Sequence, residues 1–61
     1  MKVNVYRLHD NKLHTSFKNV ESVIIEFGEK ENQYVIRYNN NGIATIARFY
    51  THYFVVESFN Y

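Results

Sequence analysis

Three histidines, His9, His14 and His52, are the side chains of this sequence best suited to chemistry. Imidazole titrates near neutral pH and is a common zinc ligand, so a histidine cluster would indicate a metal site or a general base. No two of the three stand four residues apart, the spacing that brings two ligands to one face of a helix. His9 precedes Asp10 in the polar stretch 9–12, which is typical of a solvated turn. We therefore expect structural histidines and no metal site.

The sequence also offers no catalytic centre. It has no cysteine, which excludes a cysteine nucleophile and thiolate zinc sites. Its serines lack the glycine-flanked turn that presents a nucleophile, and its glutamates alternate with lysines and apolar residues instead of forming a pair. Two glycines in the whole chain leave no loop that could cradle a phosphate. The sequence therefore predicts no catalytic residue, no cofactor and no enzyme activity.

Two arginines stand beside aromatic residues, in Arg37-Tyr38 and in Arg48-Phe49-Tyr50. Small β-domains bind single-stranded nucleic acid by stacking bases on aromatic side chains next to arginine or lysine. The formal net charge is only +1, whereas strong nucleic-acid binders carry a clear basic excess. Binding of single-stranded nucleic acid is therefore the alternative function.

The element that must position both arginines is a hairpin over residues 33–50. Two runs of β-branched and aromatic residues flank the turn 39–42, which ends in Asn-Gly, the pair that best tolerates the positive φ of a tight turn. A two-residue turn places Arg37 and Arg48 on one face with Tyr50. A three-residue turn with a glycine bulge places the arginines on opposite faces. The sequence leaves both registers open.

The first half of the chain predicts strands at residues 2–8 and 21–28 from their period-2 alternation. Between them we expect a turn at 9–12 and a short extended segment at 13–20, which ends in a turn at Lys18-Asn19. The strand 21–28 is expected to pair with the hairpin through Phe27 and Tyr34, Ile25 and Ile36, and Val23 and Tyr38. On the reverse face, Glu26 is expected to lie diagonal to Arg37.

From residue 43 to residue 59 no proline or glycine interrupts the chain, although strands rarely exceed ten residues. We place a bulge or tight turn at Thr51-His52 and a last strand at residues 53–58. The competing interpretation is a C-terminal helix within 43–56, since apolar residues there also recur at helical spacing.

These elements predict one domain over residues 1–61. The expected fold is all-β, a small antiparallel curled sheet or an SH3-like barrel of four to five strands, and the C-terminal helix would make it α+β instead. A chain of 61 residues buries too little surface to be more than marginally stable alone, so self-association is expected. Its last strands carry apolar residues on both faces. We expect a homodimer that binds another protein stoichiometrically.

The composition, rich in Asn, Ile, Tyr and Phe, suggests an accessory or inhibitory protein of a phage or mobile element. No apolar run has the length of a signal peptide or a membrane span, so we expect a cytoplasmic protein without a membrane partner. The residues expected to contact a partner are Arg37, Arg48, Tyr50, Tyr53, Phe54 and Val56.

Overall fold

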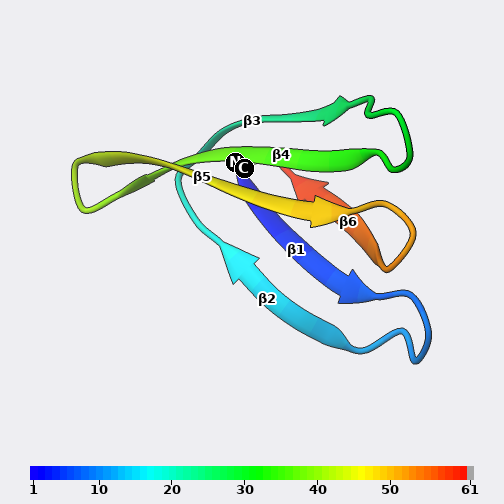
Figure 1. Ribbon diagram of the computed structural model, residues 1–61. Coiled ribbons are helices and arrows are strands. Elements are labelled where there is room, and N and C mark those ends of the chain that lie inside the picture. Colours follow the sequence, from blue (N-terminus) through cyan, green and yellow to red (C-terminus); the bar gives the residue numbers. More distant parts are fainter. Residues whose placement is uncertain (61) are drawn as a thin grey trace.

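The computed structural model describes residues 1–60, which form two three-stranded antiparallel sheets (Figure 1). One sheet has the strand order β2-β1-β6 and the other the order β3-β4-β5. The strands are β1 (Lys2–Arg7), β2 (Leu13–Phe17), β3 (Val20–Glu26), β4 (Gln33–Asn40), β5 (Ile43–Tyr50) and β6 (Phe54–Phe59).

The predicted all-β fold is confirmed. The helix considered for residues 43–56 is wrong, because that stretch forms β5, a turn and the start of β6. Residues 1–60 form six strands instead of four or five, since the extended segment after residue 12 is a strand of its own. Within these residues the two sheets do not close into a barrel.

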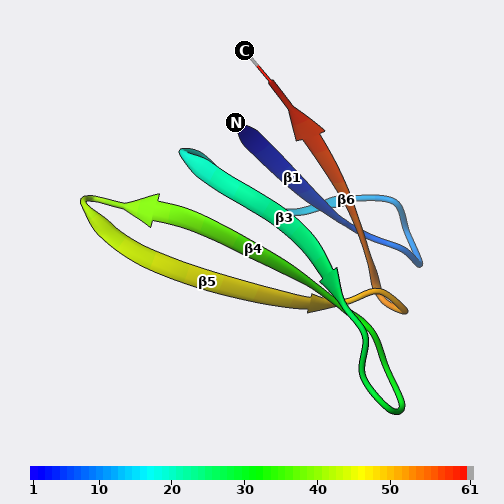
Figure 2. The same cartoon turned by 90° about the horizontal axis from the view of Figure 1, so that it is seen from above.

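The corner between β2 and β3 joins the two sheets. Asn19 has a φ of 55°, which turns the chain at the predicted Lys18-Asn19 position. The Val20 N–H donates to the Met1 carbonyl (2.9 Å), and the Asn39 N–H donates to the Asn19 carbonyl (3.0 Å). The corner is therefore bonded both to the start of β1 and to the end of β4. Figure 2 shows the N-terminus beside the start of β3.

The hairpin of β4 and β5 has the two-residue turn. Asn40 pairs with Ile43, and the turn residues Asn41 and Gly42 have φ values of 53° and 85°. The Asn39 side chain supports the turn by accepting a hydrogen bond from the Gly42 N–H (2.6 Å). This register was one of the two left open by the sequence, and the three-residue loop is excluded.

The pairing of β3 with β4 differs from the expected register by two residues. Ile25 lies opposite Tyr34 and Val23 opposite Ile36, and Phe27 lies beyond the strand with 80% of its surface exposed. Residues 27–32 form a loop that does not determine the register, and a slip of two keeps every side chain on its expected face. The predicted cross-strand pairs are therefore wrong, although the predicted faces agree.

The bend after β5 is a turn over residues 51–53, close to the predicted Thr51-His52 position. The Thr51 N–H donates to the Asn32 carbonyl (3.0 Å), and the Tyr53 N–H donates to the Tyr50 carbonyl (3.2 Å). Tyr53 consequently belongs to the turn, and the last strand begins at Phe54.

The core lies between the two sheets. Val3, Val5, Val20 and Ile36 form a buried cluster, and partly buried apolar residues of both sheets pack against it. Aromatic rings extend this core, with Phe17 4.8 Å from Tyr38 and Phe49 5.3 Å from Phe54 between ring centroids. Such ring pairs add about 0.5–1.5 kcal/mol each beyond the area they bury.

Candidate interaction surface

The sheet β3-β4-β5 has one face toward the core and one face toward solvent, which we call the outer face. Successive side chains of a strand point to opposite faces, so the observed register assigns each residue to one of them. The outer face consists of Ser22, Ile24, Glu26, Gln33, Val35, Arg37, Asn39, Ala44, Ile46, Arg48 and Tyr50.

The centre of the outer face is apolar. Ile24 and Ile46 are 52% and 49% exposed, whereas Val35 on the strand between them is only 3% exposed. Val35 lies directly opposite Ile24 on one side and opposite Arg48 on the other. Neighbouring side chains therefore cover Val35, and the two isoleucines remain in contact with water.

Arg48 crosses this face in an extended conformation. Its Nη1 donates to Glu26 Oε1 (3.1 Å) and to Gln33 Oε1 (3.2 Å), so one side chain of β5 bridges to β4 and β3. The expected partner of Glu26 was Arg37, and this expectation is wrong because the register of β3 is shifted by two residues. The charge of Arg48 is thus compensated within the chain.

Arg37 lies on the same face, opposite Ile46, as the two-residue turn requires. Its side chain is exposed, and within residues 1–60 it has no ion-pair partner. The outer face therefore brings Arg37, Arg48 and Tyr50 together, but only one of its two arginines offers an uncompensated charge.

Two tyrosines continue the outer face at the end of β5. The rings of Tyr50 and Tyr53 are 6.3 Å apart in an edge-on arrangement, and both side chains are exposed. Exposed tyrosines are common at protein interfaces because the ring contributes contact area and the hydroxyl stays hydrated.

The other two predicted contact residues point to the core. Phe54 and Val56 pack against the buried cluster, and Val55 between them is exposed. Both faces of β6 carry apolar residues, so its sequence does not indicate which face the core covers. We leave Phe54 and Val56 out of the surface defined above.

The solvent face of the sheet β2-β1-β6 has a row of hydrogen-bonded polar side chains beside the exposed Leu13 and Val55. The Ser16 hydroxyl donates to Asn4 Oδ1 (2.9 Å), Asn4 Nδ2 donates to the Tyr6 hydroxyl (3.3 Å), and that hydroxyl donates to Glu57 Oε1 (3.1 Å). This chain of hydrogen bonds connects all three strands. Covering this face with another protein would desolvate the Glu57 carboxylate, which makes the face less suited to docking.

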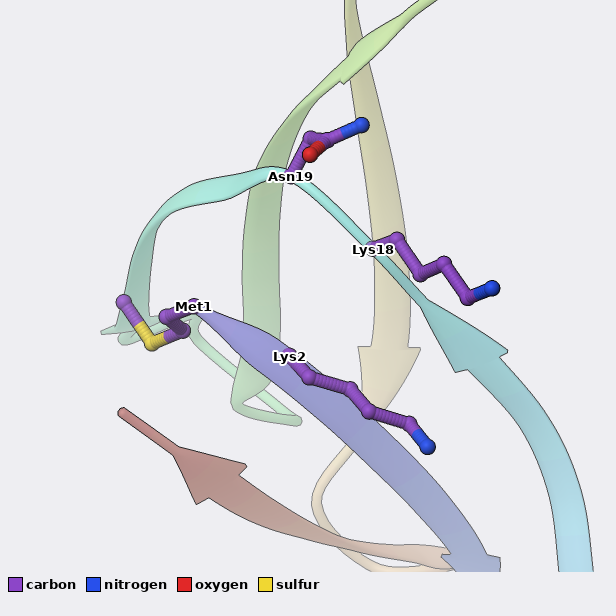
Figure 3. Close-up of a pocket in the computed structure, with 4 residues that line it drawn as sticks. All are labelled: Met1, Lys2, Lys18 and Asn19. Atoms are coloured by element: carbon purple, nitrogen blue, oxygen red, sulfur yellow. The ribbon is translucent and has the colours of Figure 1, made fainter. Parts of the chain in front are cut away.

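A hollow of about 340 Å³ lies at the corner of the sheets and is lined by Met1, Lys2, Lys18 and Asn19 (Figure 3). A second hollow of about 200 Å³ shares Lys18 and Asn19 and continues to the asparagines at the hairpin tip. Among residues 1–60, neither lining contains a carboxylate side chain. The corner therefore presents lysine and amide donors, which suit an anion.

The three histidines lie apart. The His14 ring packs 4.9 Å from Phe54, whereas His9 lies 3.6 Å from the Asp10 carboxylate in the first loop. His52 lies in the turn before β6, with its ring 6.5 Å from Tyr53. Among residues 1–60, no three His, Asp or Glu side chains gather as a metal site would require.

Asp10 is the titratable group with a clearly shifted pKa within the described part of the chain. Desolvation raises the pKa of its carboxyl, whereas hydrogen bonds from the Lys12 N–H and the Arg7 guanidinium lower it. The lowering effects together are larger, so the pKa lies below its ordinary value. Arg7 Nη2 is 2.8 Å from Asp10 Oδ2. These contacts stabilise a turn, and the carboxyl is not tuned toward neutral pH as a general acid or base would be.

No helix in the described residues is long and apolar enough to cross a membrane. Comparisons of the chain with models of known protein families, with curated proteins and with solved structures gave no match. The function must therefore be inferred from the surface itself.

Proposed function

We propose that this chain is a non-enzymatic protein-interaction module that binds another protein through the outer face of β3-β4-β5. The observation that carries the proposal is the exposure of Ile24 and Ile46 on either side of the covered Val35. Apolar side chains in the centre of a polar rim are the usual composition of a binding surface. A stoichiometric accessory or inhibitory role in the cytoplasm, as expected for a phage or mobile-element protein, needs such a surface and no catalytic group.

The rim of the outer face supports this assignment. Arg37 lies opposite Ile46, and Tyr50 and Tyr53 lie at the end of the same strand. Arginine and tyrosine are among the residues that contribute most often to the binding energy of interfaces. Burial of the apolar centre on binding would contribute a favourable free energy of about 25 cal/mol for each Å² of apolar surface removed from water.

A matched pair of variants tests the proposal. Ile24 and Leu13 are exposed to 52% and 53% on different sheets, so Ile24→Asp and Leu13→Asp introduce the same charge at equally exposed positions. In affinity capture from host cells, we expect wild type and Leu13→Asp to retain the same protein and Ile24→Asp to lose it. A target that Ile24→Asp still retains, or the absence of any retained protein, would contradict the proposal.

One observation favours a second function, the binding of single-stranded nucleic acid. Within the described residues, the corner hollow presents Lys2 and Lys18 with no carboxylate side chain in its lining, and Arg37 has no ion-pair partner. The test is the anisotropy of a labelled oligonucleotide against salt concentration. Lys18→Ala and Arg37→Ala should weaken binding and reduce the salt dependence, whereas Arg48→Ala should do so less, because Arg48 is paired with Glu26. Absence of binding at low salt would eliminate this function.

A further inference from the structure

We propose that the free edge of β5 pairs antiparallel with β5 of a second copy of this chain. This inference rests on the proposed function, because it identifies one protein partner of the same sheet. Within residues 1–60, β5 pairs with β4 on one side only, and Figure 2 shows it as the outermost strand of its sheet.

The register specifies which backbone groups are available at that edge. The Thr51 N–H donates to the Asn32 carbonyl, and in an antiparallel pair bonded and non-bonded positions alternate. Thr45, Ala47 and Phe49 therefore exchange hydrogen bonds with β4. The N–H and C=O groups at the alternate positions of β5 point away from β4, at Ala44, Ile46 and Arg48.

The β5 edge lacks the features that usually prevent pairing with another chain. Its sequence, IATIARFY, contains no proline, lysine, glycine or acidic residue, and its register with β4 has no bulge. Its single charge, on Arg48, is directed across the sheet to Glu26. The other edge strands differ, because β2 and β3 have register shifts and β6 carries Glu57.

A second copy fits this edge because the strand is complementary to itself about Ala47. Pairing Ile46 with Arg48 uses the outward backbone groups of both copies. Ala44 then lies opposite Tyr50, whose N–H also points outward and whose carbonyl already accepts from the Tyr53 N–H. The alternating positions then place the small Ala47 opposite its own copy and the small Thr45 opposite the large Phe49. A shift of the axis to Arg48 would oppose two like charges. The axis at Ala47 overlaps the whole of residues 44–50.

The pairing would join two sheets of three strands into one of six strands. A two-fold axis perpendicular to that sheet places both outer faces on the same side, so the two Ile46 side chains lie near each other and the apolar centres become one surface. The pairing would bury additional surface, which a chain of this length needs for stability. The proposed target would then contact two copies of the outer face.

The first experiment locates the axis by disulfide formation, which the absence of cysteine makes simple. Ala47 would face its own copy at a position without hydrogen bonds, where Cα atoms are about 4.5 Å apart, within the range a disulfide can bridge. Under mild oxidation, Ala47→Cys should form a covalent dimer at least ten times faster than Thr45→Cys, whose counterpart across the axis is Phe49. Equal rates for the two variants would overturn the proposed pairing.

The second experiment measures the oligomeric state by sedimentation. Wild type should have twice the chain mass of 7.4 kDa. Ile46→Pro removes an N–H that points to solvent, so the variant should retain its β-type circular dichroism and sediment as a monomer. Ile46→Lys, which places a charge against Arg48 of the second copy, provides the same test if the proline variant does not fold. A monomeric wild type, or a folded variant that stays dimeric, would overturn the proposal.

Ile24→Asp separates this inference from the proposed function. Ile24 lies on β3, away from the β5 edge, so the variant should lose the captured target and remain a dimer. If wild type is monomeric and Ile24→Asp still loses the target, the pairing fails and the outer-face function stands. If wild type is dimeric and Ile24→Asp retains the target, the function fails and the pairing stands.

Discussion

Replacing Ile36 with valine should measure how much of the stability comes from the centre of the core. Ile36 is fully buried between Val23 and Ala47, its neighbours on the adjacent strands. Removing one buried methylene costs about 1 kcal/mol, and a chain of 61 residues has a total stability of about 3–9 kcal/mol at typical values per residue. The substitution should therefore lower the melting temperature by about 4–8 °C.

Urea unfolding followed by far-ultraviolet circular dichroism gives the free energy of unfolding. All variants are compared at one protein concentration, because self-association would add a concentration-dependent contribution to that free energy. Ile24→Val is the matched control, since it removes the same methylene from a residue that is 52% exposed on the neighbouring strand. Its effect should stay within about 0.5 kcal/mol. If Ile36→Val destabilised the protein no more than Ile24→Val, the assignment of the core between the sheets would be wrong.

Substitutions at three further residues test a turn and two side-chain contacts. Gly42→Ala should cost about 1–2 kcal/mol through its φ of +85° alone, because no atom outside the adjacent residues lies within 4 Å of the added methyl. An unchanged urea midpoint would argue against this turn. Asp10→Asn should reduce stability at neutral pH but not at acidic pH. The lowered pKa of Asp10 gives a stabilisation that is present above its ordinary pKa and lost as the pH falls through the folded value, so equal stability of the two proteins at pH 7 would refute it. Arg48→Met should cost at most about 1 kcal/mol of stability, since the ion pair is exposed and the methionine still covers Val35. Arg48→Ala should cost more, because alanine leaves Val35 uncovered. Equal losses of stability in the two variants would show that the arginine stem does not cover Val35.

The parts of the fold that follow from local chemistry could be predicted from the sequence. Residues 39–42 predicted a hairpin because asparagine and glycine adopt the positive φ that the turn requires, and the structure has that turn. Lys18-Asn19 likewise marked the corner between the sheets, where Asn19 has a positive φ. Alternating apolar residues also identified the buried face of β1 around Val3 and Val5.

The parts that depend on distant contacts could not be predicted. The loop 27–32 leaves the β3 register free, so Glu26 meets Arg48 instead of Arg37. In β6 both faces are apolar, and only the position of the opposite sheet decides that Phe54 is covered and Val55 is exposed. The sequence predicted Arg37, Arg48 and Tyr50 as contact residues, and all three lie on the outer face. Ile24 and Ile46 were not predicted, because their exposure depends on which face of the sheet the second sheet covers.

The position of β1 between β2 and β6 has a consequence for the order of folding. The sheet β3-β4-β5 joins strands that follow one another in the chain, so it can form early and during synthesis. Residues 2–7, in contrast, must wait for residues 54–59, almost the full length of the chain away. Closing so long a loop is slow, and until it closes β1 has an unpaired edge beside the exposed side chains of Val3 and Val5. The nascent chain is thus most prone to aggregation just before its last strand has been made.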